Sequence, residues 1–80
     1  MEGYIVRSVA GRDRGKFMVV VGYEGDYPLV CDGKERPLER PKRKNPKHLK
    51  FTNTHFEKAQ YTTNKSLRRI IKEFAEKENG

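Results

Sequence analysis

Two glycines near the N-terminus enclose a short segment in which cations alternate with other residues. Residues 10–16 read AGRDRGK and lie between two β-like runs. Gly11 and Gly15 can adopt positive φ without a steric cost, and Asp13 can accept hydrogen bonds from N–H groups of its own loop. The cations of this predicted tight loop are Arg12, Arg14 and Lys16. Cations on a loop that is ordered in advance are suited to bind phosphates, although an ordinary hairpin loop with solvated charges is the alternative.

A second group of cations follows in the middle of the chain. The protein has 80 residues and a formal net charge of +7, and residues 34–50 contain eight Lys or Arg against two Glu. Pro41 and Pro46 stiffen the most basic part, so its charges keep a nearly fixed geometry. Such a localised field attracts polyanions or anionic membrane surfaces, but it could also serve solubility or nuclear localisation. The candidate phosphate contacts of this segment are Lys34, Arg36, Arg40, Lys42, Arg43, Lys44, Lys47, His48 and Lys50.

The elements that must position these cations are mainly strands. The apolar and β-branched runs typical of strands are residues 4–9, 17–22 and 27–32. The unbroken second run predicts burial on both faces of a sheet. Asp32-Gly33 predicts a two-residue hairpin turn that leads into a fourth strand over residues 34–39, and residues 48–51 can close the sheet. Five short strands with tight turns indicate a small closed or partly open barrel.

The C-terminal part predicts an amphipathic helix, whereas the secondary structure of residues 53–62 is ambiguous. Thr63 or Asn64 can cap a helix that runs to about Glu78. The apolar stripe, which we expect to dock on the barrel, comprises Leu67, Ile70, Ile71, Phe74 and Ala75. The cationic stripe comprises Lys65, Arg68, Arg69 and Lys72. This second stripe either faces a partner or is merely solvated, and Arg68 and Arg69 are our candidate contacts within it. We thus expect a barrel over residues 1–52 and a linker with a helix over residues 53–80.

Metal, cofactor and catalytic sites are not expected. Cys31 is the single cysteine, so the chain cannot form an internal disulfide, and its apolar neighbours indicate a small core residue. A zinc site would require Cys31, His48 and His55 to converge with a fourth ligand, without any Cys-x-x-Cys or His-x₃₋₅-His pair to anchor it. No run is apolar enough to span a bilayer, and the N-terminus lacks the apolar region of a signal peptide. We therefore expect a cytoplasmic protein without a membrane partner.

The strand–GRDRGK–strand arrangement resembles the KOW motif, which occurs in small β-barrels of ribosomal proteins and transcription elongation factors. Residues 32–34 (DGK) and 39–49 (ERPKRKNPKHL) look like KOW proteins related to the fourteenth eukaryotic- and archaeal-type large-subunit ribosomal protein. The resemblance covers roughly residues 3–52. Many KOW motifs have another glycine two residues after the loop lysine, where this chain has Met18, which fits the ribosomal relatives better than the elongation factors. The resemblance implies an SH3-like barrel that binds RNA.

We therefore expect a non-enzymatic, monomeric, ribosome-associated protein that binds structured large-subunit ribosomal RNA through two cationic loops, with ribosomal proteins as further partners in translation. The chain predicts no DNA recognition helix or zipper, whereas structured RNA is recognised largely by shape and backbone. An unpaired base could stack on one of four aromatic residues, although core packing is favoured for each: Tyr23, Tyr27, Phe51 and Tyr61. The alternative is a KOW or SH3-like protein-interaction module of the transcription or translation machinery, marked by an exposed aromatic groove.

Overall fold

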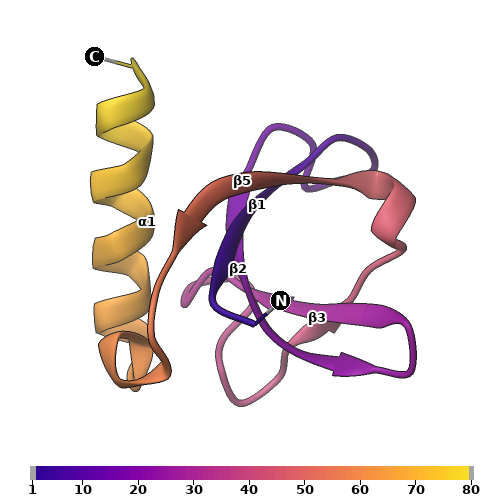
Figure 1. The fold of residues 1–80 in the computed structure, drawn as a ribbon, viewed down its shortest axis with the longest axis horizontal. Helices are drawn as coiled ribbons and strands as arrows, with labels where there is room; N and C mark the ends of the chain where they lie inside the picture. The colour runs from indigo at the N-terminus through magenta and orange to yellow at the C-terminus, as the bar shows by residue number, and fades with distance from the viewer. Residues whose placement is uncertain (1, 80) are drawn as a thin grey trace.

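The β-branched runs of the sequence form one antiparallel sheet in the computed structural model, which describes residues 2–79 (Figure 1). The strands are β1 (Tyr4–Ser8), β2 (Phe17–Glu24), β3 (Tyr27–Cys31), β4 (Lys42–Arg43) and β5 (Leu49–His55). They are ordered β4-β3-β2-β1-β5. Two 3₁₀ turns and one helix complete the domain: η1 (Pro46–His48), η2 (Lys58–Tyr61) and α1 (Asn64–Asn79). The sheet curls, but no ladder joins β4 to β5 within the described residues, so it is open rather than closed as a barrel.

The sheet separates two hydrophobic cores because side chains alternate between its faces along each strand. The core on the concave face comprises Val6, Met18, Val20, Val30 and Leu49. The core between the sheet and α1 comprises Ile5, Val19, Cys31, Tyr61, Leu67, Ile70 and Phe74. Consecutive residues of β1 and β2 thus enter different cores. Burial of the second strand on both faces is confirmed at Met18, Val19 and Val20, each 0% exposed.

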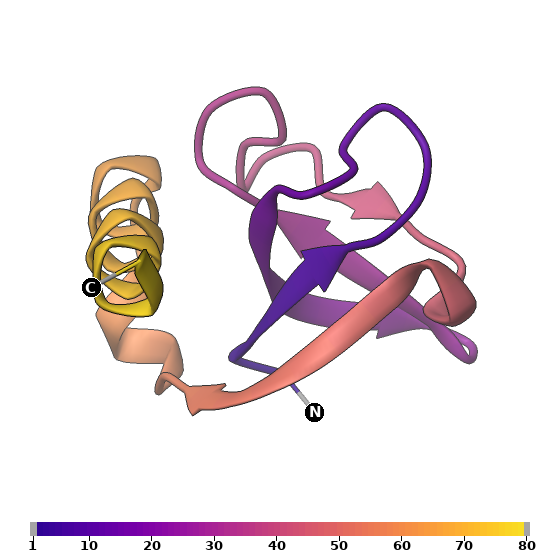
Figure 2. The same cartoon turned by 90° about the horizontal axis from the view of Figure 1, so that it is seen from above.

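The helix begins and docks as its sequence predicts. The backbone N–H of Ser66 donates to Oγ1 of Thr63 at 3.1 Å, which caps the first turn. Leu67, Ile70 and Phe74 are buried against the sheet, and the Phe74 and Phe17 rings pack edge to face with 5.1 Å between their centroids. Burial of this stripe holds α1 against the sheet beside β1 and β2 (Figure 2). Among the described residues, no helix is long and apolar enough to cross a membrane.

The expected fourth strand over residues 34–39 is wrong. These residues form turns and bends, and the strand that pairs with β3 is β4, with Arg43 opposite Leu29. The Asp32 carboxylate accepts hydrogen bonds from the N–H groups of Lys34 and Arg36, at 2.9 and 2.8 Å, which folds the chain back on itself. A two-residue hairpin of this kind requires positive φ at both turn residues, but no described residue other than glycine has it.

The last strand is longer than expected. It begins at Leu49 rather than His48, because Pro46–His48 forms the 3₁₀ turn η1, and it continues to His55 through residues that the sequence left ambiguous. Core packing is found for Tyr61, which is 5% exposed. The preference for core packing is wrong for Tyr23 and Tyr27, which lie in the β2–β3 hairpin and are 40% and 44% exposed.

Candidate nucleic-acid interface

The β1–β2 loop is closed by hydrogen bonds of its own backbone. The Gly15 N–H donates to the Ser8 carbonyl at 2.7 Å, and the Lys16 N–H donates to the Asp13 carbonyl at 2.9 Å. Gly11 and Gly15 have φ of +80° and +87°, as expected from the sequence. A side chain at these positions would be strained by the backbone conformation, so the two glycines permit the tight path of the loop. The loop is therefore built before any ligand arrives.

One buried carboxylate gathers cations from other segments around this loop. Asp13 is 3% exposed, and its Oδ2 lies 3.4 Å from Lys42 Nζ, 3.7 Å from Lys44 Nζ and 3.8 Å from Arg36 Nη2. Lys44 Nζ also donates to the Ala10 carbonyl at 3.4 Å. We call these four charged residues, Asp13, Arg36, Lys42 and Lys44, the Asp13 cluster. Its ion pairs connect the β1–β2 loop to the β3–β4 loop and to the chain at β4.

The electrostatics of the Asp13 cluster favour an ionised carboxylate with an excess of positive charge. Burial raises the pKa of Asp13, but the attraction of Lys42, Arg36 and Lys44 outweighs it, and the pKa lies below the ordinary value of 3.8. At neutral pH the cluster holds three cations and one anion. The side chains of Arg36 and Lys42 are 31% and 34% exposed, so part of this excess charge faces solvent.

Two expectations for this region need correction. Asp13 was expected to cap N–H groups of its own loop, but its carboxylate faces the cations of other segments instead. Lys44 was expected to face solvent as a phosphate contact, but it is 7% exposed and its ammonium group is paired with Asp13. A charged group buried beside an opposite charge is a structural element, and removal of either partner leaves the other uncompensated. Lys44 is therefore a structural residue rather than a candidate ligand contact.

The β3–β4 loop is tied to both the β1–β2 loop and α1. Glu35 accepts a hydrogen bond from Lys16 Nζ at 3.2 Å. The guanidinium of Arg68 donates to the Gly33 carbonyl at 2.6 Å, and Oδ1 of Asn64 accepts the Leu38 N–H at 2.8 Å. Figure 2 shows the two loops rising on the same side of the sheet, next to each other. The candidate interface thus lies at one end of the sheet, where the two loops contact each other.

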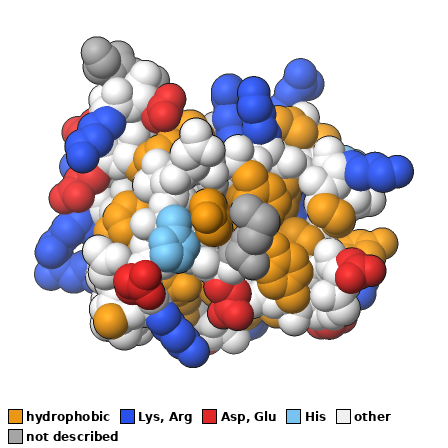
Figure 3. All heavy atoms as spheres, viewed as in Figure 1, with side chains coloured by type: hydrophobic (Ala, Val, Ile, Leu, Met, Phe, Trp, Pro, Cys, Tyr) orange, Lys and Arg blue, Asp and Glu red, His pale blue; other side chains and the backbone are white. Residues whose placement is uncertain are grey.

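The cations that point outward at this end are those without a buried partner. Arg12 and Arg14 are exposed on the β1–β2 loop, and neither forms an ion pair with a described residue. Lys34 is exposed on the β3–β4 loop, beside Lys16, whose side chain is 44% exposed despite its pairing with Glu35. Basic side chains project at the upper edge of Figure 3, where Figure 1 shows the β1–β2 loop.

Other cations expected in the site lie elsewhere. Arg43 points away from the Asp13 cluster, because its guanidinium pairs with Glu24 at 3.2 Å and lies over the Tyr27 ring at 5.2 Å from the centroid. Arg68 is engaged with the β3–β4 loop. The remaining expected contacts are exposed, on the β3–β4 loop, on η1, on β5 and on α1: Arg40, Lys47, His48, Lys50 and Arg69.

A groove of about 430 Å³ separates the β1–β2 loop from α1. Its apolar lining consists of Phe17, Ile71 and Ala75, and its cationic lining consists of Lys16, Lys34, Arg68 and Lys72. Asp32 is the acidic residue among those that line it. The cationic stripe of the helix therefore does not lie wholly opposite the docked face, since Arg68 and Lys72 border the cationic end of the sheet.

Sequence reasoning missed Arg7. This residue is exposed between the buried Val6 and Ser8, and it lines two hollows of the surface. The alternation of buried and exposed residues along a strand was the available signal, because a cation in an apolar strand marks the outward position. Arg7 lies opposite Lys50 on β5.

The described residues contain no group of three His, Cys, Asp or Glu side chains arranged to hold a metal ion. Cys31 is a buried core residue, as expected, and burial raises the pKa of its thiol to about 11. The Sγ–H donates to the Pro37 carbonyl at 3.3 Å. No protein-family model matches this chain, and no curated protein sequence is significantly similar to it.

Proposed function

We propose that this protein is a non-enzymatic RNA-binding protein that binds phosphates of structured RNA at the loop end of its sheet. The observation that carries the proposal is the Asp13 cluster, in which one buried carboxylate organises three cations from two other segments of the chain. Because these contacts already exist in the free protein, binding requires little further ordering of the loops. A preorganised excess of positive charge is the arrangement that phosphate backbones require.

The exposed arginines of the β1–β2 loop supply the contacts themselves. Arg12 and Arg14 extend from a loop whose backbone is fixed by hydrogen bonds and by two positive-φ glycines. A guanidinium group can bind two oxygens of one phosphate, so a fixed arginine gives both charge and orientation. Lys16 and Lys34 add charge at the same end of the sheet.

Structured RNA is favoured over DNA as the partner. The apolar face of α1 is buried against the sheet, and no second helix is present among the described residues to enter a major groove. Recognition of structured RNA relies on shape, on phosphates and on 2′-hydroxyl groups, which cationic loops at one end of a rigid sheet can contact.

We infer further that the curled sheet is an SH3-like barrel of the KOW type and that its target is large-subunit ribosomal RNA. The resemblance of residues 10–16 and 39–49 to KOW proteins of the ribosome supports this, together with the positive φ of both loop glycines. The protein would then act as a cytoplasmic, ribosome-associated monomer in a ribonucleoprotein, with neighbouring ribosomal proteins as further contacts.

A binding assay with paired charge variants tests the proposal. The Arg12→Gln/Arg14→Gln variant removes two exposed charges from the loop, whereas the control, Lys58→Gln/Lys77→Gln, removes two exposed charges outside it. We expect the loop variant to bind a large-subunit ribosomal RNA fragment more weakly than the wild type. The slope of log K against log salt should decrease by about 1 for each arginine removed. The control should keep the wild-type slope.

Equal losses in both variants would show that only net charge matters and would contradict a site at the β1–β2 loop. Crosslinking in cells followed by sequencing of the attached RNA tests the identity of the target. Reads concentrated on large-subunit ribosomal RNA would support the ribosomal assignment, whereas reads spread over messenger RNAs would refute it.

One observation favours a protein-interaction module as a second candidate function. The groove between the β1–β2 loop and α1 has an apolar floor and a cationic rim, which fits an acidic peptide with apolar side chains. It is not the aromatic groove expected for such a module, because Phe17 is its single aromatic lining residue. Association that survives nuclease treatment would favour this candidate, and association that nuclease abolishes would favour RNA binding.

A further inference from the structure

Two cations lie directly opposite each other on neighbouring strands. Arg7 of β1 pairs with Lys50 of β5 in the antiparallel ladder, and both side chains are exposed. Partners in an antiparallel ladder project from the same face of the sheet, so the two cationic side chains leave the sheet next to each other. Like charges at directly opposite positions destabilise a sheet. The pair therefore acts against the stability of the free protein.

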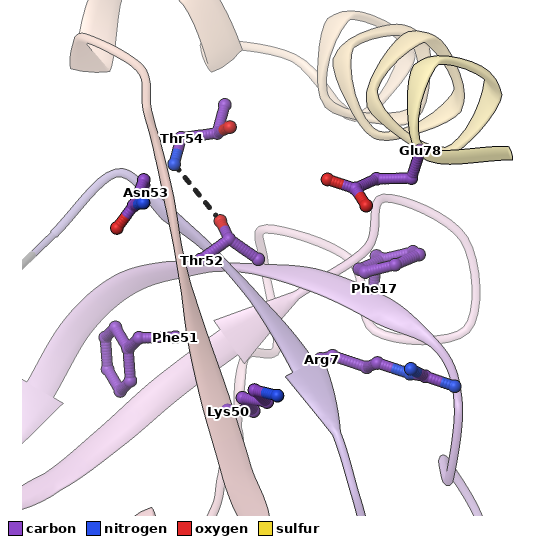
Figure 4. Close-up of a pocket in the computed structure, with 8 residues that line it drawn as sticks. All are labelled: Arg7, Phe17, Lys50, Phe51, Thr52, Asn53, Thr54 and Glu78. Atoms are coloured by element: carbon purple, nitrogen blue, oxygen red, sulfur yellow. Dashed lines mark hydrogen bonds between the residues drawn. The ribbon is translucent and has the colours of Figure 1, made fainter. Parts of the chain in front are cut away.

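Nothing within ion-pair distance compensates this repulsion in the described part of the chain. None of the five ion pairs found there includes Arg7 or Lys50. Both residues line a pocket of about 350 Å³ at the C-terminal end of α1, shown in Figure 4. Glu78 is the acidic residue of the lining and lies across the pocket on α1. The pocket thus presents two cations and a single acid.

The pocket lies beside the β1–β2 loop. Arg7 also borders a second hollow of about 230 Å³, which Arg14 and Gly15 line from the loop. Cations therefore follow one another from Arg14 to Arg7 and then to Lys50 across the face of β1 and β5. A phosphate backbone bound at the loop would meet this path without a gap in the positive charge.

We propose that Arg7 and Lys50 form a second phosphate site, which binds the RNA backbone where it leaves the β1–β2 loop and crosses β1 and β5. This inference rests on the proposed RNA-binding function. A bound phosphate places negative charge between the two cations and converts their repulsion into two attractions. Asn53 and Thr54 line the same pocket and offer side-chain hydrogen-bond donors for phosphate or ribose oxygens, whereas the Thr52 hydroxyl already donates to the Ile5 carbonyl at 2.7 Å.

The proposal predicts that stability and affinity respond in opposite directions. Replacing Lys50 by Gln removes the repulsion, so the melting temperature of the free protein should rise. Lys50→Glu should raise it further, because an acidic residue would attract Arg7 across the strands. Affinity for a labelled structured RNA hairpin should change in the opposite direction: Lys50→Gln should bind more weakly than the wild type, and Lys50→Glu more weakly still. Lys50→Gln should also reduce the salt slope by about 1.

Matched variants complete the experiment. Arg7→Gln should repeat the effects of Lys50→Gln, and Lys58→Gln, an exposed lysine on η2, should leave both the melting temperature and the salt slope unchanged. A lower melting temperature in Arg7→Gln and Lys50→Gln would overturn the proposal. It would show that the two cations stabilise the free protein, through attraction to Glu78 and the C-terminal end of α1.

Raised melting temperatures with unchanged RNA affinity and salt slope would also overturn the proposal, while the function proposed for the β1–β2 loop would stand. Failure of the wild-type protein to bind RNA would instead refute the proposed function and the second site together. RNA binding by the wild-type protein distinguishes the two outcomes.

Discussion

Replacing Asp13 by Asn removes the charge of a buried carboxylate while keeping the shape of its side chain. Lys44, which is 7% exposed, would keep its hydrogen bond to the Ala10 carbonyl but lose its counter-charge. Breaking a buried ion pair from one side costs about 3–5 kcal/mol. Lys42 and Arg36 are about one third exposed, so water screens part of their loss. We expect the free energy of unfolding to fall by about 2–4 kcal/mol.

For a domain of this size, such a loss lowers the melting temperature on the order of 10–30 °C. Circular dichroism melts at neutral pH measure it, with Asp26→Asn in the exposed β2–β3 turn as the control that removes the same charge. Adding Lys44→Met to Asp13→Asn should raise the melting temperature again, since it removes the uncompensated ammonium group. A wild-type melting temperature in the Asp13→Asn variant would refute the structural role of the cluster.

The pH dependence gives the same experiment a second readout. The folded-state pKa of Asp13 lies below its ordinary value of 3.8, so its stabilising contribution is fully present above that value. It is lost as the pH falls through the lower folded-state pKa. The difference in melting temperature between the wild type and Asp13→Asn should therefore stay constant from about pH 7 to 5 and shrink below about pH 4. A constant difference down to pH 2 would contradict the ionised state of Asp13.

Three further predictions follow from burial and backbone geometry. Lys44→Glu should lower the melting temperature strongly, whereas Lys47→Glu, on the exposed turn η1, should change it by only a few degrees. Gly33→Ala should destabilise more than Gly15→Ala in urea denaturation, because a Cβ at Gly33 would meet a backbone carbonyl of α1 at 2.5 Å, whereas one at Gly15 meets nothing within 4 Å. The Cys31 thiol, whose pKa is about 11, should react with a thiol reagent at pH 8 only as fast as the protein opens; rapid labelling without denaturant would disprove its burial.

The elements with a strong local signal were predictable. The strands β1, β2 and β3 and the helix α1 follow from apolar periodicity and from one capping residue, Thr63, because each signal lies within the element that it predicts or directly beside it. The course of residues 32–41 was not predictable. Asp32-Gly33 is compatible with a hairpin and with a folded loop, and the contacts that select the loop come from Asn64 and Arg68 on α1, far away in the sequence.

The roles of individual cations were harder to predict than their location. Lys42, Arg43 and Lys44 are consecutive and chemically alike, but extended backbone turns the first and third toward Asp13 and the second toward Glu24. Side-chain alternation predicts these directions only once the position of β4 is known. From the sequence, the fourth strand was expected several residues earlier. A run of basic residues therefore predicts a charged surface better than it predicts which charges reach that surface.

The β3–β4 loop has a consequence for the order of folding. Its anchors on the helix are the Arg68 guanidinium at the Gly33 carbonyl and the Asn64 amide, which binds the Leu38 N–H and the Glu39 carboxylate. These contacts join residues that are 25 to 35 positions apart in the sequence, a separation that slows folding relative to local contacts. During synthesis, residues 33–39 emerge well before Asn64 and Arg68 exist. The sheet can thus begin to form early, whereas the cationic end of the molecule acquires its final shape only once the helix has docked.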